Sequence, residues 1–372
     1  MPLSLLAGLG IFLSIPTHFT SGTPGSPSTT LTVKQKLLSI DYAGAVLLVS
    51  TIVLFLYGLS SPQIQLVPIS IGIMLLPLFI LNELMFTSVP LIPLSLLRSR
   101  GVLLTCLAQV GFMSVRWSIL FYTPVYALSL LNWGPARAGS ILIPTNLGFA
   151  VGGLIAGHFH IRRSGSFYSS CIIAFSLFTA SILALAILTT RPHYHAMIGW
   201  RGHVWIYIST TFIGGFFTGA ALNYTLAHLL HLTHPSTHFI ATSLLATFRG
   251  FAGSFGSAIG GGLFLRTLRD GLSRGPSGEG SMPGATKPVP GSSGLSEDLI
   301  RKLLASPALV PELRGHKAEV AMFAYQHALR TVFFCGAGLA VVMVLVQACT
   351  GSAKGDLPEE DDDERNEQII VD

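Results

Sequence analysis

Long apolar segments recur along the chain at the length that crosses a lipid bilayer. A spanning helix needs about 20 predominantly apolar residues, because the hydrocarbon core is about 30 Å thick. Eight runs reach that range, and a ninth, residues 3–16, is several residues too short. The eight runs are 43–59, 66–86, 102–128, 138–159, 167–189, 204–230, 239–265 and 331–349. The chain is therefore expected to be an all-α integral membrane protein, with about eight full transmembrane helices and one partial N-terminal helix.

The composition excludes a soluble enzyme. Charged residues make up 10% of the 372 residues and hydrophobic residues 50%, with a mean hydropathy of +0.63. A soluble protein carries about 25% charged residues, and its single cores stop growing near 250 to 300 residues. The sequence contains no paired acids, His-Glu-x-x-His or Gly-x-Ser-x-Gly element, so neither a catalytic site nor a cofactor is expected.

The basic net charge does not indicate nucleic-acid binding. The formal charge of +5 divides into −7 for residues 351–372, where nine acids face Lys354 and Arg365, and +12 for the residues before them. Those basic residues mostly flank apolar runs, where Lys and Arg fix membrane topology, and no basic run is interleaved with aromatic residues. The lipid bilayer is the expected partner, and nucleic acid is not.

Lys and Arg in the short loops predict which side of the membrane is cytosolic. With alternating spans, one side carries six of these residues and the other three: Lys34, Lys36, Arg98, Arg100, Arg162 and Arg163 against Arg137, Arg191 and Arg201. The first side is expected to be cytosolic. A linker over residues 17–41 and a tail over 350–372 then lie in the cytosol, and a loop over 266–327 lies outside.

The hydrophilic segments differ in their expected structure. Gly, Pro and Ser dominate residues 271–294 of the outer loop, a composition typical of a flexible segment. Residues 298–304 have helical spacing and Ser296 can cap them, so a short amphipathic helix is expected within 298–324. The acidic tail has few apolar residues and is expected to be disordered.

Small residues at four-residue spacing concentrate in two of the predicted spans. This spacing lets helix backbones touch, and such packing is a main source of helix association in lipid. The residues are Gly148, Gly152, Gly153 and Gly157 in the run 138–159, and Gly253, Gly256 and Gly260 in the run 239–265. Two interpretations stay open: close packing alone, or smooth faces that slide during alternating access.

Five polar residues within the spans are candidates for lining a substrate cavity. A central Arg costs about 2.5 to 3.5 kcal/mol to insert, so Arg249 and Arg116 are expected to face a cavity or a partner. Arg116 can instead snorkel to the interface if its helix is shorter than drawn. Asn223, Asn146 and Tyr224 complete the set, and for these three the alternative is an ordinary interhelical hydrogen bond.

Four histidines lie three, three and four residues apart, which places them on one helical face: His228, His231, His234 and His238. Imidazole is a common metal ligand, but Pro235 interrupts the helix and neither Cys nor a carboxylate joins the set. We expect no metal site. An interfacial cluster and, for His228, a proton relay are the interpretations that remain.

Acids are scarce in the predicted membrane region. Asp41 and Glu83 are the only two before Arg266, and both lie at span ends. A proton-coupled transporter needs a titratable carboxylate or histidine in its pathway. Neither acid fits that role, so any coupling carboxylate is expected in sequence beyond this chain.

Three motifs resemble one family of membrane proteins. Residues 40–44, Ile-Asp-Tyr-Ala-Gly, look like the start of the inserted helix pair in fourteen-span drug:proton antiporters of the major facilitator superfamily. Ala138 and Gly139 with Pro144, Gly148 and Gly153 are similar to a second family span. Residues 249–258, Arg-Gly-Phe-Ala-Gly-Ser-Phe-Gly-Ser-Ala, resemble a third stretch. The wider segment 242–265 is closest to fungal members, some of which are vacuolar basic amino-acid carriers.

The resemblance implies a domain organisation. Residues 1–16 correspond to the last helix of the first bundle, 42–86 to the inserted helix pair, and 102–349 to the C-terminal six-helix bundle, the second half of a major facilitator fold. The first five to six spans of the family pattern are expected to be absent.

The resemblance also implies a function. The expected activity is proton-coupled export of a small molecule, such as a cationic drug, a toxin or a basic amino acid, across the plasma membrane or the vacuolar membrane. The alternative is a non-transporting membrane protein that pairs with or regulates a full-length relative.

Overall fold

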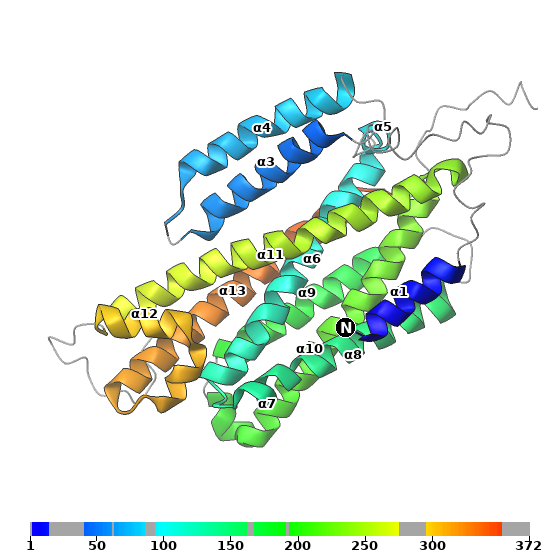
Figure 1. The fold of residues 1–372 in the computed structure, drawn as a ribbon. Coiled ribbons are helices and arrows are strands. Elements are labelled where there is room, and N and C mark those ends of the chain that lie inside the picture. The colour runs from blue at the N-terminus through cyan, green and yellow to red at the C-terminus, as the bar shows by residue number, and fades with distance from the viewer. Residues whose placement is uncertain are drawn as a thin grey trace, which may run out of the picture.

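The computed structural model of the chain is a set of long helices. It describes residues 2–14, 41–61, 63–85, 94–161, 167–190, 193–274 and 295–351, and all regular secondary structure in this part is helical (Figure 1). The principal helices are α1 (Pro2–Ser14), α3 (Tyr42–Ser60), α4 (Leu66–Met85), α6 (Arg100–Ser129), α8 (Leu142–Ile155), α9 (Tyr168–Thr190), α10 (His193–Leu232), α11 (His238–Arg274) and α13 (His316–Ala348). Short helical pieces lie between them: α5 (Leu94–Leu97), α7 (Pro135–Ser140), η2 (Ala156–His160), η3 (Pro235–Thr237), α12 (Glu297–Ala305) and η4 (Pro307–Glu312).

The helices bear out an integral, multi-pass membrane protein. Within the described residues, seven helical segments are long and apolar enough to cross a membrane, and they coincide with seven of the eight predicted spans. The remaining predicted span, 239–265, lies in α11. This helix is 37 residues long, but it is not among the seven, because Arg249 and the many Gly and Ser residues lower its mean hydropathy.

Six helices pack into one bundle around a continuous apolar core. Helix α8 packs on α10, α6 packs on α11 and α13, and α9 packs on α10 and α13. The core is dense in aromatic side chains: Phe112 of α6 stacks on Phe175 of α9 at 4.2 Å between ring centroids, and Tyr126 stacks on Tyr207 of α10 at 4.3 Å. These contacts fix α6 as the central element of the bundle.

Helices α3 and α4 form an antiparallel pair beside the bundle, next to α11 (Figure 1). Asp41 caps α3 by accepting a hydrogen bond from the backbone N–H of Gly44 at 2.8 Å, and its carboxylate also accepts one from Asn82 of α4 at 2.9 Å. At the far end of α3, the Arg266 guanidinium of α11 donates to the backbone carbonyls of Leu59 and Ser61 at 2.8 and 3.1 Å. Arg266 therefore satisfies carbonyls that the last turn of a helix leaves without partners.

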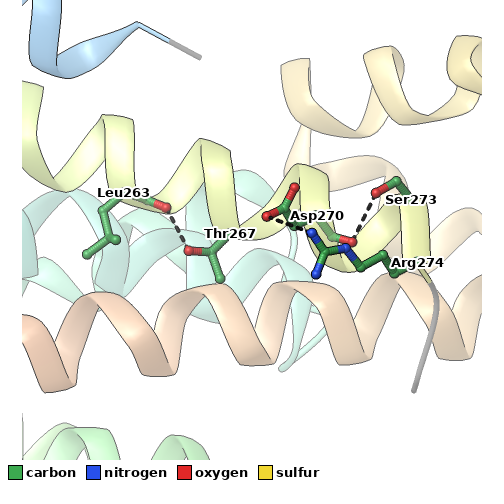
Figure 2. Close-up of polar contacts among 5 residues, drawn as sticks. All are labelled: Leu263, Thr267, Asp270, Ser273 and Arg274. Atoms are coloured by element: carbon green, nitrogen blue, oxygen red, sulfur yellow. Dashed lines mark hydrogen bonds and ion pairs between the residues drawn. The ribbon is translucent and has the colours of Figure 1, made fainter. Parts of the chain in front are cut away.

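Helices extend into the segment 266–327 that was expected to be an outer loop. Helix α11 continues to Arg274, and α13 already begins at His316. The reason for the extension of α11 is packing: beyond the apolar run, Leu268 and Leu272 are fully buried in the bundle core. In the same turns, Thr267 and Ser273 bond to the carbonyls of Leu263 and Asp270, and Arg274 pairs with Asp270 at 3.8 Å (Figure 2). The expected amphipathic helix corresponds to α12 and η4.

Other predicted segments lie wholly or largely outside the described residues. These are the linker 17–41 apart from Asp41, the Gly-, Pro- and Ser-rich residues 275–294, and the tail from residue 352. The predicted partial helix 3–16 corresponds to α1, whose described leucines are exposed and which makes no extensive contact with the other described helices.

Candidate functional site

Arg116 lies in the middle of α6 with its side chain inside the bundle. The residue is 7% exposed. Its guanidinium lies 4.3 Å from the ring centroid of Phe149 and reaches Asn146 Oδ1 at 3.5 Å, both on α8. Arg116 therefore points into the protein and does not snorkel to the interface. Within the described residues, no acid forms a salt bridge with it.

A small cavity opens beside Arg116 where α6, α8, α9 and α10 meet. The space open to the centre of a water molecule is about 10 Å³, which is room for roughly one water. Its walls combine a cation, four hydroxyls, apolar side chains and two glycines: Arg116, Ile119, Thr145, Phe178, Ser181, Leu185, Thr211, Gly214, Gly215 and Thr218. The described helices are thus nearly closed at this point.

The hydroxyls of this cavity are not equivalent. Ser181, Thr211 and Thr218 each donate to a carbonyl of their own helix, at 2.7 to 2.8 Å. Thr145 is 5% exposed, and its Oγ1 has no hydrogen-bond partner among the described residues. A buried hydroxyl without a partner costs about 1 to 3 kcal/mol. Thr145 is therefore the one of the four that is left to bind something else.

Arg249 occupies a different position, on α11. Its Nη2 donates to the carbonyl of Leu222 at 2.7 Å and contacts the Thr225 hydroxyl at 3.1 Å, both on α10. Its Nε is buried and has no partner among the described residues. Arg249 does not line the cavity beside Arg116. Its hydrogen bonds join two helices of the bundle.

Asn223 and Tyr224 connect α10 to the segment of α8 and η2. Asn223 Nδ2 donates to the carbonyl of Gly153 at 2.8 Å. The Tyr224 hydroxyl lies 2.8 Å from His160 Nδ1. Of the five residues that the sequence nominates, only Arg116 lines the cavity, and Asn146 is exposed and lies 3.5 Å from the Arg116 guanidinium. Roles for all five remain predictions.

The predicted packing glycines lie on two helix crossings. A Cβ atom added to Gly148 or Gly152 of α8 would overlap backbone atoms of Phe212 or Phe216 on α10, and one added to Gly256 of α11 would overlap the Ser114 carbonyl on α6. Space at the remaining four is less restricted by backbone: Gly153, Gly157, Gly253 and Gly260.

Several residues that shape the site were not predicted from the sequence. Gly215 and Gly219 of α10 face α8 as closely as Gly148 and Gly152 face α10, and their four-residue spacing was the signal that could have found them. Thr145 had no comparable signal, because a lone Thr in a span usually bonds to its own helix.

The histidines do not assemble into a metal site. In the part of the chain that the structure describes, no three His, Cys, Asp or Glu side chains are placed to share a metal ion. His228 is fully buried and contacts the Thr350 hydroxyl at 3.1 Å, whereas His238 contacts the carbonyl of Thr233 at 3.2 Å. Glu83, expected at a membrane edge, is only 4% exposed because α4 packs it against the protein.

Comparisons with known proteins agree with a transporter scaffold. No family model matches the sequence. The MFS-type efflux pump LUC4 of Fusarium sp is 26% identical over 257 residues, covering 66% of this chain and 43% of that protein. The chain is thus similar to a protein named as an MFS-type transporter. The MFS-type transporter clz4 of Cochliobolus lunatus is 25% identical over 331 residues, with 86% of this chain and 53% of that protein covered. TwmF of Talaromyces wortmannii, also named an MFS-type transporter, is 24% identical over 336 residues, with 87% and 57% covered.

These relatives support a place for the chain in the major facilitator superfamily. They are transporters and not enzymes, in agreement with the expectation that the chain is not an enzyme. The chain spans about half the length of the curated relatives it matches.

Proposed function

We propose that the chain forms the C-terminal part of a membrane exporter of a small organic molecule. The observation that carries the proposal is a buried cation, Arg116, beside a small cavity at the meeting point of four bundle helices, in a chain whose relatives are named efflux pumps and transporters. Ionisable residues that face a bundle interior usually belong to a substrate or ion pathway.

The finer assignment follows from the motifs. We propose that α3 and α4 are the inserted pair of a fourteen-span antiporter, that the bundle from α6 to α13 is the second of two bundles, and that the pathway is completed by a first bundle. Proton coupling would then reside mainly in that first bundle, because Asp41 and Glu83 both lie in the α3–α4 region and not beside the cavity. The membrane would be the plasma or the vacuolar membrane.

The test compares the 372-residue chain alone with the same chain joined to the first bundle of the clz4 transporter. Both proteins are reconstituted in liposomes with an imposed proton gradient, and flux of a panel of cationic, neutral and anionic small molecules is measured. We expect flux for the joined protein and none for the chain alone.

Two controls keep this comparison interpretable. Circular dichroism and gel filtration establish that each protein is helical and monodisperse, and collapse of the gradient with an uncoupler must abolish flux. A folded joined protein that moves no compound contradicts the transporter proposal. Recovery of the folded chain in a stable complex with a complete relative, without flux, would favour the regulatory alternative.

A further inference from the structure

We propose that the cavity between α6, α8, α9 and α10 binds a small anionic group through Arg116 and Thr145. The group is the carboxylate of an organic molecule or a free monovalent anion such as chloride. The proposal deepens the proposed function, on which it rests for the role of the site in transport, although anion binding itself is measurable without flux.

The charge of the site is the first argument. Arg116 is 7% exposed and forms no salt bridge within the described part of the chain. Its neighbours on α8 are the face of Phe149 at 4.3 Å and the amide oxygen of Asn146 at 3.5 Å. An aromatic face and one long hydrogen bond leave most of the five guanidinium donors unused. A buried cation is compensated best by a charge of opposite sign.

The hydrogen-bonding character of the lining is the second, independent argument. The hydroxyls of Ser181, Thr211 and Thr218 donate to carbonyls of their own helices. The Thr145 hydroxyl is 5% exposed and has no partner among the described residues. The lining side chains with donors left over are therefore Thr145 and Arg116. Donors of this kind suit an acceptor with negative charge and disfavour a cation.

Arg249, the other arginine within a predicted span, occupies a different environment. Its Nη2 bonds to the Leu222 carbonyl at 2.7 Å and contacts the Thr225 hydroxyl at 3.1 Å, its Nε has no partner among the described residues, and it lines no part of this cavity. Arg249 therefore joins α11 to α10, whereas Arg116 lies beside the cavity.

The size of the cavity limits the occupant. It has room for about one water. Chloride and a carboxylate group are both larger than water, so either one requires the lining side chains to move slightly outward. Gly214 and Gly215 form part of the wall and keep this space free of side chains. An organic anion would insert its charged head here and leave its body outside, unless the helices move apart.

The test measures anion binding to the purified full chain in detergent. The protein is held in sodium gluconate, whose anion is too large for the cavity, and is titrated at constant ionic strength with sodium chloride, sodium acetate or sodium benzoate. Benzamide is the neutral partner of benzoate. The thermal unfolding midpoint gives stabilisation, and isothermal calorimetry gives the dissociation constant.

Three variants sharpen the measurement. We expect Arg116→Gln to abolish the anion-dependent rise in the midpoint, and Thr145→Val, which keeps the side-chain shape, to weaken binding about ten-fold. Arg330→Gln is the matched control, because Arg330 also lies near a phenylalanine ring, Phe334, but is exposed on α13. This control should bind anions as the unmodified chain does.

The outcomes separate the sources of the anion and the two proposals. Saturation by chloride with no effect of benzoate assigns the site to a free anion, whereas binding of acetate and benzoate but not benzamide assigns it to a carboxylate. A midpoint that follows ionic strength alone, or binding that survives Arg116→Gln, overturns the proposal. If Arg116→Gln does not fold, unchanged binding in Thr145→Val overturns it instead. Anion binding without flux leaves this inference standing while the transport proposal fails, and flux without anion binding does the reverse.

Discussion

The six-helix bundle and the α3–α4 pair are both built from membrane helices, yet they are held in opposite ways. In the bundle, the buried share of the apolar spans runs from 61% in α6 to 28% in the span that contains α8, against 22% in α3 and 17% in α4. The bundle helices bury side chains in one shared core, whereas most residues of the pair are not buried. Because lipid is as apolar as Leu, burial of apolar area adds little between membrane helices. Backbone approach and polar bonds therefore decide how firmly each part is attached.

The contacts between helices follow this division. In the bundle, Gly152 of α8 and Gly219 of α10 let two backbones touch along a crossing. The pair contacts the rest of the molecule along one side: Phe79 joins an apolar cluster with Val102 and Leu244, the Phe55 ring lies 6.2 Å from that of Phe255, and Arg266 binds the last carbonyls of α3. The bundle should therefore unfold as a unit, and the pair should detach from it at lower cost.

The largest expected effect comes from filling a bundle crossing. Gly256→Leu would force a side chain into the Ser114 carbonyl, a backbone group that cannot move aside. Overpacking of a dense interior typically costs about 1 to 3 kcal/mol, and a clash with backbone belongs at the top of that range. We expect the variant to lose its sharp gel-filtration peak and to unfold in detergent at a markedly lower temperature than the unmodified chain.

A matched control lies on the same helix. Gly250 has open space where its Cβ would be, so Gly250→Leu should unfold like the unmodified chain. Equal losses for the two variants would show that any leucine at a glycine of α11 is harmful, and the comparison between crossing and exposed positions would fail.

The sequence predicted the helices better than their mutual contacts. Runs of about 20 apolar residues locate α3, α4, α9 and α13, because a chain in lipid has to satisfy its backbone within each helix. Helix α11 extends past its apolar run because Leu268 and Leu272 are buried in the bundle core. The neighbours that bury them are visible only in the folded arrangement.

An intermediate effect is expected where the pair meets the bundle. Arg266→Met keeps the length of the side chain but removes the bonds to Leu59 and Ser61. A hydrogen bond to a charged group contributes about 1.5 to 3 kcal/mol, so opening of α3 should become roughly ten-fold or more favourable. Hydrogen exchange should accelerate in the last turns of α3 and stay unchanged in α6.

The control is Arg269→Met, which removes an exposed arginine three residues further along α11. It should leave exchange in α3 as it is. If Arg266→Met also accelerates exchange throughout α6, then the pair and the bundle form one cooperative unit and the contrast drawn from their burial is wrong.

The candidate site was less predictable than the fold, for a physical reason. A polar residue in a predicted span needs a hydrogen-bond partner, but the sequence does not show which group supplies it. Arg249 was favoured over Arg116 from position alone, but the acceptor on Leu222 is a backbone carbonyl, and every residue has one. Likewise, the acceptors of Arg266 lie more than 200 positions away in the chain. Only the folded arrangement shows that Thr145 and Arg116 face the same cavity.

The smallest expected effect tests whether side-chain bonds contribute much to the bundle. Asn223→Leu removes the 2.8 Å bond to the Gly153 carbonyl between α10 and α8. Interhelical bonds of this kind average about 0.6 kcal/mol, because the unfolded chain in a membrane or micelle also finds partners. Unfolding by dodecyl sulfate should shift by about that amount. The control is Thr210→Val on the same helix. The Thr210 hydroxyl bonds only to the Ile206 carbonyl, so this variant should shift the unfolding less.

A loss above about 2 kcal/mol for Asn223→Leu would exceed what such bonds supply. It would mean that the α8–α10 crossing depends on its polar bond and not on the close approach of Gly148 and Gly152.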